Sequence, residues 1–189
     1  MIKEAIKKLV AGNDLTFDEA AQVMDEMFSG TATQSQMAAY LTALRIKGET
    51  IDEITASAQV MREKALHIKP NRDVLDIVGT GGDDTGTFNI STTAAFIIAA
   101  AGIPVAKHGN RSMSSKSGSA DCLEQLGINI NITPEKSEEV LNKAGICFMF
   151  AQGYHSSMKY VGPVRKEIGI RNIFNVLGPL TNPAGADLQ

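Results

Sequence analysis

Residues 74–121 read VLDIVGTGGDDTGTFNISTTAAFIIAAAGIPVAKHGNRSMSSKSGSAD, and their pattern is the strongest indication of the fold class. It begins with an apolar run at 74–78 that Gly79 stops, a pattern typical of a short buried strand. Two loops rich in glycine and serine follow, at 79–92 and 107–121, and the uncharged apolar segment between them predicts a buried helix. Two polar loops joined by one helix can converge on a single small ligand.

Strands and helices continue to alternate after the first strand. Apolar runs predict further strands at 103–106, 128–132 and 146–150, and helical spacing predicts helices at 91–101, 119–126 and 133–144. Alternation of this kind predicts an α/β domain with a mostly parallel sheet.

The first third of the chain predicts helices only. Capping boxes, in which a threonine precedes an acid or amide by three residues, stand at 16–19, 33–36 and 50–53. Apolar residues at helical spacing follow each box. Together with residues 2–11 they predict four short helices, in a unit that ends near Pro70.

The expected fold class is therefore α/β, with a small all-helical N-terminal domain at 1–70. The first part of a larger α/β domain would occupy 71–163. A helix at 164–177, between Pro163 and Gly178, would return to the helical domain within 164–189. Because no closing strand or helix follows it, we interpret the chain as truncated within the larger domain.

Composition excludes several classes of protein. The net charge of −3 and the absence of tryptophan argue against a nucleic-acid-binding surface. The longest apolar run, residues 94–101, is too short to cross a bilayer. Cys122 and Cys147 are the only cysteines and do not form a Cys-x-x-Cys pair, which indicates reduced thiols in the cytoplasm.

The first loop suits an anion. Gly79 lets backbone approach a ligand, and the helix after it presents free N–H groups and a partial positive charge. Asn89, Ser91 and Thr92 stand where they can serve this site or simply cap the helix. The loop lacks the Gly-Lys-Ser/Thr of a Walker motif, and Asp84 replaces the third glycine of the dinucleotide fingerprint.

The second loop combines cations with hydroxyls. Lys107, Arg111 and Lys116 lie among five serines and two glycines, a set suited to pyrophosphate or to phosphate with its metal. A solvated flexible loop is the alternative. His108 fits either a ligand contact or a polar loop position. Asp83 of the first loop and Asp121 each fit a metal site, a sugar hydroxyl or a helix cap.

Two residues near the end of the chain complete the candidates. Arg165 would open the last expected helix, where a cation is unfavourable unless an anion such as a carboxylate ligand pairs with it. A solvated charge is the alternative. His155 has no partner that the sequence identifies.

Three motifs carry a resemblance to a known family. GTGGDDTGTFNIST at 79–92, KHGNRSMSSKSGSAD at 107–121 and RNIFNVLGPLTNPAG at 171–185 resemble the anthranilate phosphoribosyltransferases of tryptophan biosynthesis. The likeness extends over the whole chain. It implies a helical domain hinged to an α/β domain, an active site in the cleft, and a cytoplasmic homodimer formed through the helical domain.

The resemblance also implies an activity. The family transfers 5-phosphoribose from phosphoribosyl pyrophosphate to the amine of anthranilate, with magnesium, and releases pyrophosphate. Matched by motif, the contacts to phosphoribosyl pyrophosphate would be Gly79, Gly82, Asp83, Thr87, Asn89, Ile90, Ser91, Thr92, Lys107, His108, Gly109, Asn110, Arg111, Ser112, Met113, Ser114, Ser115 and Ser119. Ser91 would also touch Mg²⁺, and anthranilate would meet Gly79, His108, Asn110 and Arg165.

One departure from the family and two other readings remain. Full-length family members continue past Gln189 and supply an adjacent Asp-Glu pair that holds magnesium, so we expect this 189-residue chain to be inactive alone. A pyrimidine-nucleoside phosphorylase, which shares the two-domain fold, is the nearest alternative. A non-catalytic relative that binds nucleic acid is the second.

Overall fold

A computed structural model describes residues 1–80, 88–112 and 117–189, which form two compact units. Unit 1 consists of Met1–Lys64 and Ser156–Thr181, and unit 2 of Ala65–His155 and Asn182–Gln189. The domain boundaries expected near residues 70 and 163 stay a prediction. The two units are described separately below.

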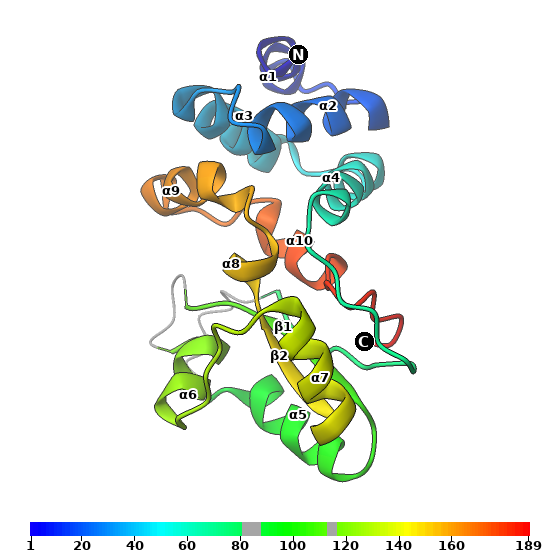
Figure 1. Cartoon of the computed structure of the whole chain (residues 1–189). Helices are drawn as coiled ribbons and strands as arrows, with labels where there is room; N and C mark the ends of the chain where they lie inside the picture. The colour runs from blue at the N-terminus through cyan, green and yellow to red at the C-terminus, as the bar shows by residue number, and fades with distance from the viewer. Residues whose placement is uncertain (81–87, 113–116) are drawn as a thin grey trace. The chain divides into compact units, whose positions relative to one another are not determined.

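Unit 1 is built from helices in the described residues (Figure 1). Its first four are α1 (Ile2–Val10), α2 (Phe17–Phe28), α3 (Gln34–Lys47) and α4 (Ile51–Glu63), and the later segment adds α9 (Met158–Ile168) and α10 (Phe174–Leu180). The helical first third is thus confirmed.

Capping boxes begin α2, α3 and α4. The Thr16 hydroxyl accepts the Glu19 N–H at 3.3 Å, and the Glu19 carboxylate accepts the Thr16 N–H at 2.9 Å. Thr33 with Gln36 and Thr50 with Glu53 repeat the arrangement. Each box satisfies two backbone donors that the helix start leaves unpaired, so each helix begins where the motif places it.

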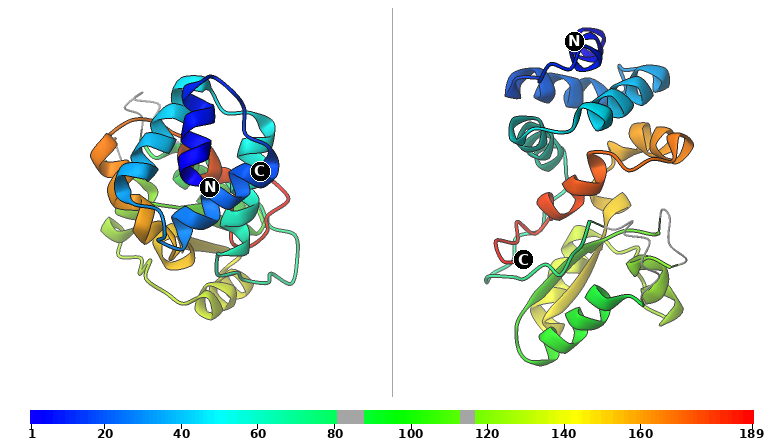
Figure 2. Two further views of the ribbon diagram at one scale, coloured as in Figure 1. Left: turned by 90° about the horizontal axis from the view of Figure 1, so that it is seen from above. Right: turned by 180° about the vertical axis from the view of Figure 1, so that it is seen from behind.

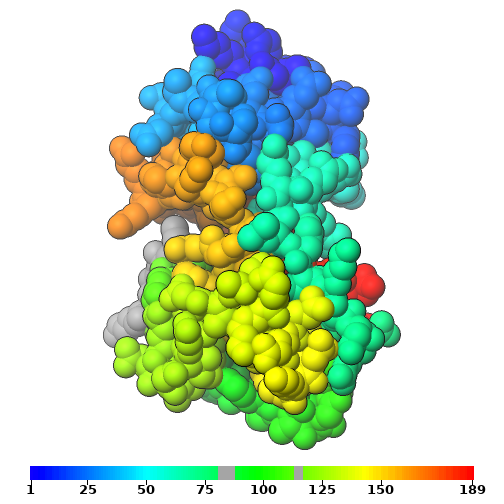
Figure 3. Space-filling model, viewed as in Figure 1, coloured from blue at the N-terminus to red at the C-terminus, as the bar shows by residue number. Residues whose placement is uncertain are grey.

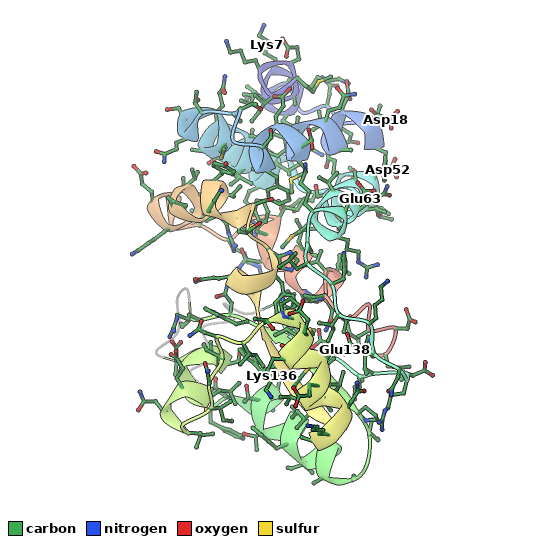
Figure 4. The ribbon with its side chains drawn as sticks, in the orientation of Figure 1. Lys7, Asp18, Asp52, Glu63, Lys136 and Glu138 are labelled. Atoms are coloured by element: carbon green, nitrogen blue, oxygen red, sulfur yellow. The ribbon has the colours of Figure 1, made fainter. Side chains whose placement is uncertain are left out.

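The core of unit 1 joins both of its chain segments. Met24, Met27 and Tyr40 are fully buried and lie in one cluster with Val161 and Leu177 from the later segment. Charged residues of the opposite helix faces, such as Lys7, Asp18 and Asp52, project into solvent (Figure 4). The first four helices alone therefore do not complete this core.

The single helix expected at 164–177 is wrong. α9 ends at Gly169, whose φ of +62° is left-handed and closes the helix. α10 begins after a break in which the Asn172 side chain accepts the Phe174 N–H at 3.2 Å. Pro163 lies inside α9 rather than before it.

Unit 2 contains a parallel sheet. β1 (Val105–Gly109) and β2 (Ile146–Phe150) pair in parallel, with Val105 opposite Ile146 and Gly109 opposite Phe150. Leu75 adds parallel bridges to Val105 on one side and to Leu188 on the other. The helices of this unit are α5 (Ile90–Ala100), α6 (Ser119–Gln125), α7 (Pro134–Ala144) and α8 (Ala151–Tyr154).

Two expected strands differ from the structure. Residues 74–78 form only the isolated bridges at Leu75, and residues 128–132 form no strand. Of the alternating residues 128–132 only Ile130 is buried, in a small cluster with Leu123 and Phe150, so alternation there reflects one inward side chain. The α/β class with a parallel sheet is nevertheless confirmed.

The helices of unit 2 differ in how far they are covered. α7 packs along β2 through Leu141, and its other face forms the surface in Figure 3. α5 lies near the sheet (Figure 2), but it buries only Thr92 and Ala95. Ile97 is 66% exposed, so the expectation of a buried helix is wrong for the described chain.

Candidate functional site

Both loops start from the same edge of the sheet. Residues 74–80 run parallel to β1, and each leads into one of the two loops at its carboxyl end. β2 ends at the same edge and leads through α8 to His155. Carboxyl ends of parallel strands are where open α/β sheets bind ligands.

The described ends of the two loops meet. The Asn89 side-chain amide, at the start of α5, lies 3.5 Å from the Ser117 hydroxyl of the second loop. Because this hydrogen bond is long, it contributes little stabilising energy, but it shows that the two side chains are neighbours. It shows that residues 28 positions apart in the chain lie side by side, while convergence of the two loops on one ligand stays a prediction.

The first turn of α5 carries the remaining described candidates of the first loop. Asn89 is the N-cap residue, but its side chain makes no capping hydrogen bond to this helix. Ile90 is exposed, Ser91 is half-buried and Thr92 is buried. Because Asn89 does not cap, the helix start keeps, within the described parts of the chain, N–H groups that an anion can use.

The second loop is held together by Asp121. One carboxylate oxygen of Asp121 accepts the N–H groups of Ser112 at 3.0 Å and Gly118 at 2.8 Å. These two bonds hold the pKa of Asp121 below its usual value, with help from Arg111. Of the roles open to Asp121, the structure thus shows the one at a helix start.

Arg111 is paired within the protein. Its guanidinium contacts Glu124 through two nitrogens, at 2.5 and 2.8 Å, and Asp121 at 3.0 Å. It also lies 5.5 Å from the ring centre of Phe150. The sequence showed no partner for this arginine, although Glu124 lies near the end of the short helix α6 that follows the loop.

Two backbone contacts close the second loop at its base. The Asn110 carbonyl oxygen accepts the Ser119 hydroxyl at 3.2 Å and the Ala120 N–H at 3.3 Å. A Cβ on Gly118 would lie 2.7 Å from the Arg111 carbonyl carbon, and one on Gly109 would lie 2.7 Å from the Phe148 ring. Only glycine fits these two positions without a shift of the neighbours.

Lys107 and His108 are buried, at 5% and 4% exposure, rather than solvated. The Lys107 ammonium donates to the carbonyl oxygen of Ile77. The His108 N–H donates to the Asp76 carboxylate at 3.2 Å. Burial lowers the pKa of Lys107, and Asp76 opposes that effect.

His155 has a neighbour that the sequence did not identify. Its ring lies 5.0 Å from the His108 ring, at a tilt of 52°. Both histidines are buried. The signal available in the sequence was that His108 lies at the end of one strand of a parallel sheet and that His155 follows the neighbouring strand.

Arg165 belongs to unit 1 and lies in the last turn of α9, so its expected place at a helix start is wrong. A cation is favourable at a helix C-terminus, which removes the electrostatic argument for a bound anion. Its guanidinium stands 5.2 Å from the Phe174 ring centre, and burial lowers its pKa. Its buried Nε has no hydrogen-bond partner in the described part of the chain.

Other candidates are exposed or lie outside the described residues. Gly79 is exposed, with open space where a side chain would be. The candidates that the structure does not describe are Gly82, Asp83, Thr87, Met113, Ser114, Ser115 and the cation Lys116.

The described residues include no cluster of three or more histidine, cysteine or acidic side chains placed to hold a metal. The Ser91 hydroxyl is an oxygen ligand of the kind that Mg²⁺ accepts beside phosphate oxygens and water, so it fits as one ligand of a shared site. Among the same residues, no helix has both the length and the apolar character needed to span a membrane.

Curated relatives are similar to this chain over its whole length. An anthranilate phosphoribosyltransferase of Ruminiclostridium cellulolyticum is 61% identical over all 189 residues, which is 55% of that relative. One from Lachnoclostridium phytofermentans is 62% identical, across 56% of its length. The chain thus spans about half the length of the curated relatives it matches.

Solved structures of the same kind superpose on the chain. Anthranilate phosphoribosyltransferase from Thermus thermophilus is 48% identical with a TM-score of 0.90, over 97% of this chain and 56% of that one. The Saccharomyces cerevisiae enzyme in complex with phosphoribosyl pyrophosphate (PRPP) and Mg is 28% identical with a TM-score of 0.88. The match covers 96% of this chain and 55% of that one.

Two family models match the chain in succession. Residues 3–65 match the helical bundle domain of a glycosyl transferase family, and residues 71–189 match its α/β domain. The order of the two matches follows the order of helices and strands described above. The chain therefore belongs to this glycosyl transferase family, in which a helical bundle domain precedes an α/β domain.

Proposed function

We propose that this chain carries the substrate-binding loops of an anthranilate phosphoribosyltransferase of tryptophan biosynthesis. The observation that carries the proposal is the contact between Asn89 and Ser117, which joins the two loops beside the uncapped start of α5. The named relatives and the yeast complex with PRPP and Mg support the same substrate.

The proposed reaction joins the anthranilate nitrogen to the anomeric carbon of the ribose. The bond from that carbon to pyrophosphate breaks, and the nitrogen loses a proton. The transition state is cation-like at the sugar, with negative charge growing on pyrophosphate. An aromatic amine is neutral at pH 7, so the protein mainly positions the two substrates and stabilises the leaving charge.

The residues of the two loops would divide this work. Backbone N–H groups at the start of α5, with Ser91 and Thr92, would meet the phosphates. Ser91 would hold Mg²⁺, which neutralises charge on pyrophosphate when bound. The described part of the second loop, Lys107 through Ser112, would wrap the pyrophosphate side, with Ser119 nearby.

Arg165 would bind the anthranilate carboxylate. Its buried Nε keeps an unused donor within the described chain, and its guanidinium plane is held against Phe174. A planar donor of this kind matches a carboxylate well. In unit 2, the anthranilate contacts that we propose are His108 and Asn110.

A chimeric protein tests the function. Residues 1–189 are joined to the remaining residues of the Ruminiclostridium relative, and turnover of anthranilate with PRPP and Mg²⁺ is followed by fluorescence. We expect activity from the chimera and none from the 189-residue chain alone. An inactive chimera beside an active parent relative contradicts the proposal, and phosphorolysis of thymidine instead would favour the nucleoside phosphorylase.

We further propose that the protein is a cytoplasmic homodimer formed through unit 1. Both cysteines are free thiols, as expected in a reducing compartment. Ile46 and Ile51 of unit 1 are 81% and 82% exposed and offer apolar surface for an interface. Sedimentation of the wild-type chain and of the Ile46→Lys variant tests this, since a monomeric wild type contradicts it.

A further inference from the structure

The bridges of Leu75 define where the next pair of backbone hydrogen bonds in the parallel ladder would form. We call this pair the next rung of the sheet. The Leu75 N–H donates to the Pro104 carbonyl at 2.9 Å, and the Ala106 N–H donates to the Leu75 carbonyl at 2.9 Å. In a parallel ladder, the next bonds would run from the Ile77 N–H to the Ala106 oxygen and from the His108 N–H to the Ile77 oxygen.

Side chains occupy that rung instead. The Ala106 oxygen accepts the Asn182 amide at 2.9 Å, and the His108 N–H donates to the Asp76 carboxylate at 3.2 Å. The Ile77 oxygen accepts the Lys107 ammonium. Three backbone groups of one missing rung are thus each satisfied by a different side chain, which we call the rung-replacing triad: Asp76, Lys107 and Asn182.

The triad is buried. Asp76, Asn182 and Lys107 are 0%, 3% and 5% exposed. Burying two opposite charges and an amide is costly, and continued backbone pairing would satisfy the same carbonyl and amide groups without them. Satisfying these backbone groups with buried side chains therefore costs more free energy than the backbone hydrogen bonds of the missing rung would.

The position of the triad suggests its purpose. Ile77 stands two residues before Gly79, where the first loop leaves, and His108 stands one residue before Gly109, where the second leaves. Asn182 is tied to its own segment because its side-chain oxygen accepts the Ala184 N–H at 2.7 Å. The triad therefore sits where the two loop-bearing segments part.

We propose that Asp76, Lys107 and Asn182 are positioning residues that replace one rung of the sheet and so set the gap between the two phosphate loops. The importance of the gap rests on the proposed function, whereas the replaced rung stands on the geometry alone. The triad would act through the backbone of both loops, and Asp76 and Asn182 would not touch the ligand.

The test compares Asn182→Leu with Tyr154→Phe in the 189-residue chain. Tyr154→Phe removes another buried hydrogen bond of unit 2, from the Tyr154 hydroxyl to the Ser137 hydroxyl at 2.7 Å, and serves as the matched control. Affinity for magnesium pyrophosphate is measured by calorimetry. We expect Asn182→Leu to weaken binding about tenfold to hundredfold and the control to bind like wild type.

A second readout does not depend on binding. In nuclear magnetic resonance spectra, we expect the amide signals of Gly79, Thr80 and Asn110 to move in Asn182→Leu and to stay in place in Tyr154→Phe. In Asp76→Asn, which keeps an acceptor for His108 but loses the charge beside Lys107, the same signals should move by a smaller amount.

The outcomes separate the two proposals. A wild-type chain that binds neither magnesium pyrophosphate nor PRPP counts against the proposed function, and the amide signals then still decide whether the triad positions the loops. Unmoved loop amides in a folded Asn182→Leu variant overturn the triad. Wild-type affinity in that variant also overturns it. If Asn182→Leu does not fold, Asp76→Asn is judged by the same two measurements.

Discussion

The rings of His108 and His155 lie 5.0 Å apart, centre to centre, in the interior of unit 2. One histidine precedes the second loop on β1, and the other follows α8 after β2. The contact joins the ends of two neighbouring strands through side chains. We therefore expect the orientation of the His108 ring, which the proposed function places beside anthranilate, to depend on His155.

Replacing His155 with alanine tests this dependence. We expect the substitution to lower the free energy of unfolding by about 1–3 kcal/mol, because it removes a buried ring. The ring signals of His108 should also shift and broaden. Urea unfolding and nuclear magnetic resonance measure the two effects, and a sharp, unmoved His108 spectrum in the variant would contradict the dependence.

Glu53 is a buried connection point of unit 1. Its carboxylate accepts the N–H groups of Leu15 at 2.9 Å and Thr50 at 2.8 Å, and it pairs with Lys47 at 2.9 Å. Breaking a buried ion pair costs about 3–5 kcal/mol. We expect Glu53→Gln to fall near the lower end, because Asp14 still pairs with Lys47.

The matched control for Glu53→Gln is Glu139→Gln on α7, which removes exposed pairs to Lys136 and Lys143. Exposed pairs are screened by water, so this variant should unfold almost like wild type. Thermal unfolding of both proteins checks the prediction. An equal decrease in unfolding temperature in the two variants would show that Glu53 contributes no more to stability than an exposed acid does.

Acidification should open the second loop. The Ser112 and Gly118 amides hold the pKa of Asp121 below its usual 3.8, and Arg111 holds the pKa of Glu124 below 4.5. A depressed pKa means that this stabilisation is complete above about pH 5, beyond both unfolded-state values, and is lost as the pH falls through the lower, folded-state values.

The amide signals of Ser112 and Gly118 report on the loop during such a titration. We expect both to move together below pH 4, and to be displaced already at neutral pH in Asp121→Asn. Signals that titrate near pH 6 instead would point to a different group.

Gly118 is expected to tolerate no side chain. A Cβ there would collide with the backbone of Arg111 and Ser112, so Gly118→Ala should lower the free energy of unfolding by about 1–3 kcal/mol and weaken PRPP binding. Gly153→Ala is the control, since nothing lies within 4 Å of its added Cβ. Thermal unfolding and calorimetry of the two variants compare them, and similar results for both would reject the steric argument.

Features set by neighbouring residues were predictable from the sequence. The three capping boxes place the starts of α2, α3 and α4, and Gly145, which takes a left-handed conformation, ends α7 as expected. Gly169 ends α9 in the same way, so the break in the predicted helix at 164–177 carried a readable signal.

Features that depend on distant partners were not predictable. The apolar composition of α5 does not reveal that Ile97 remains exposed, and alternation at 128–132 does not supply a neighbouring strand. The partner of Arg111 lies 13 residues away across a loop, and the amide that meets the Ala106 oxygen comes from Asn182, 76 residues away. The sequence shows which residue types these partners are, but it does not show which residues they pair with.

The pairing of Arg111 has a consequence for how an anion is met. Glu124 and Asp121 together outweigh its single charge, and Lys107 is opposed by Asp76. Within the described parts of the loops, no surplus cation thus remains to balance a polyphosphate. A diphosphate bound by these described residues would meet little net positive charge, so we expect its magnesium complex to bind more tightly than the bare anion.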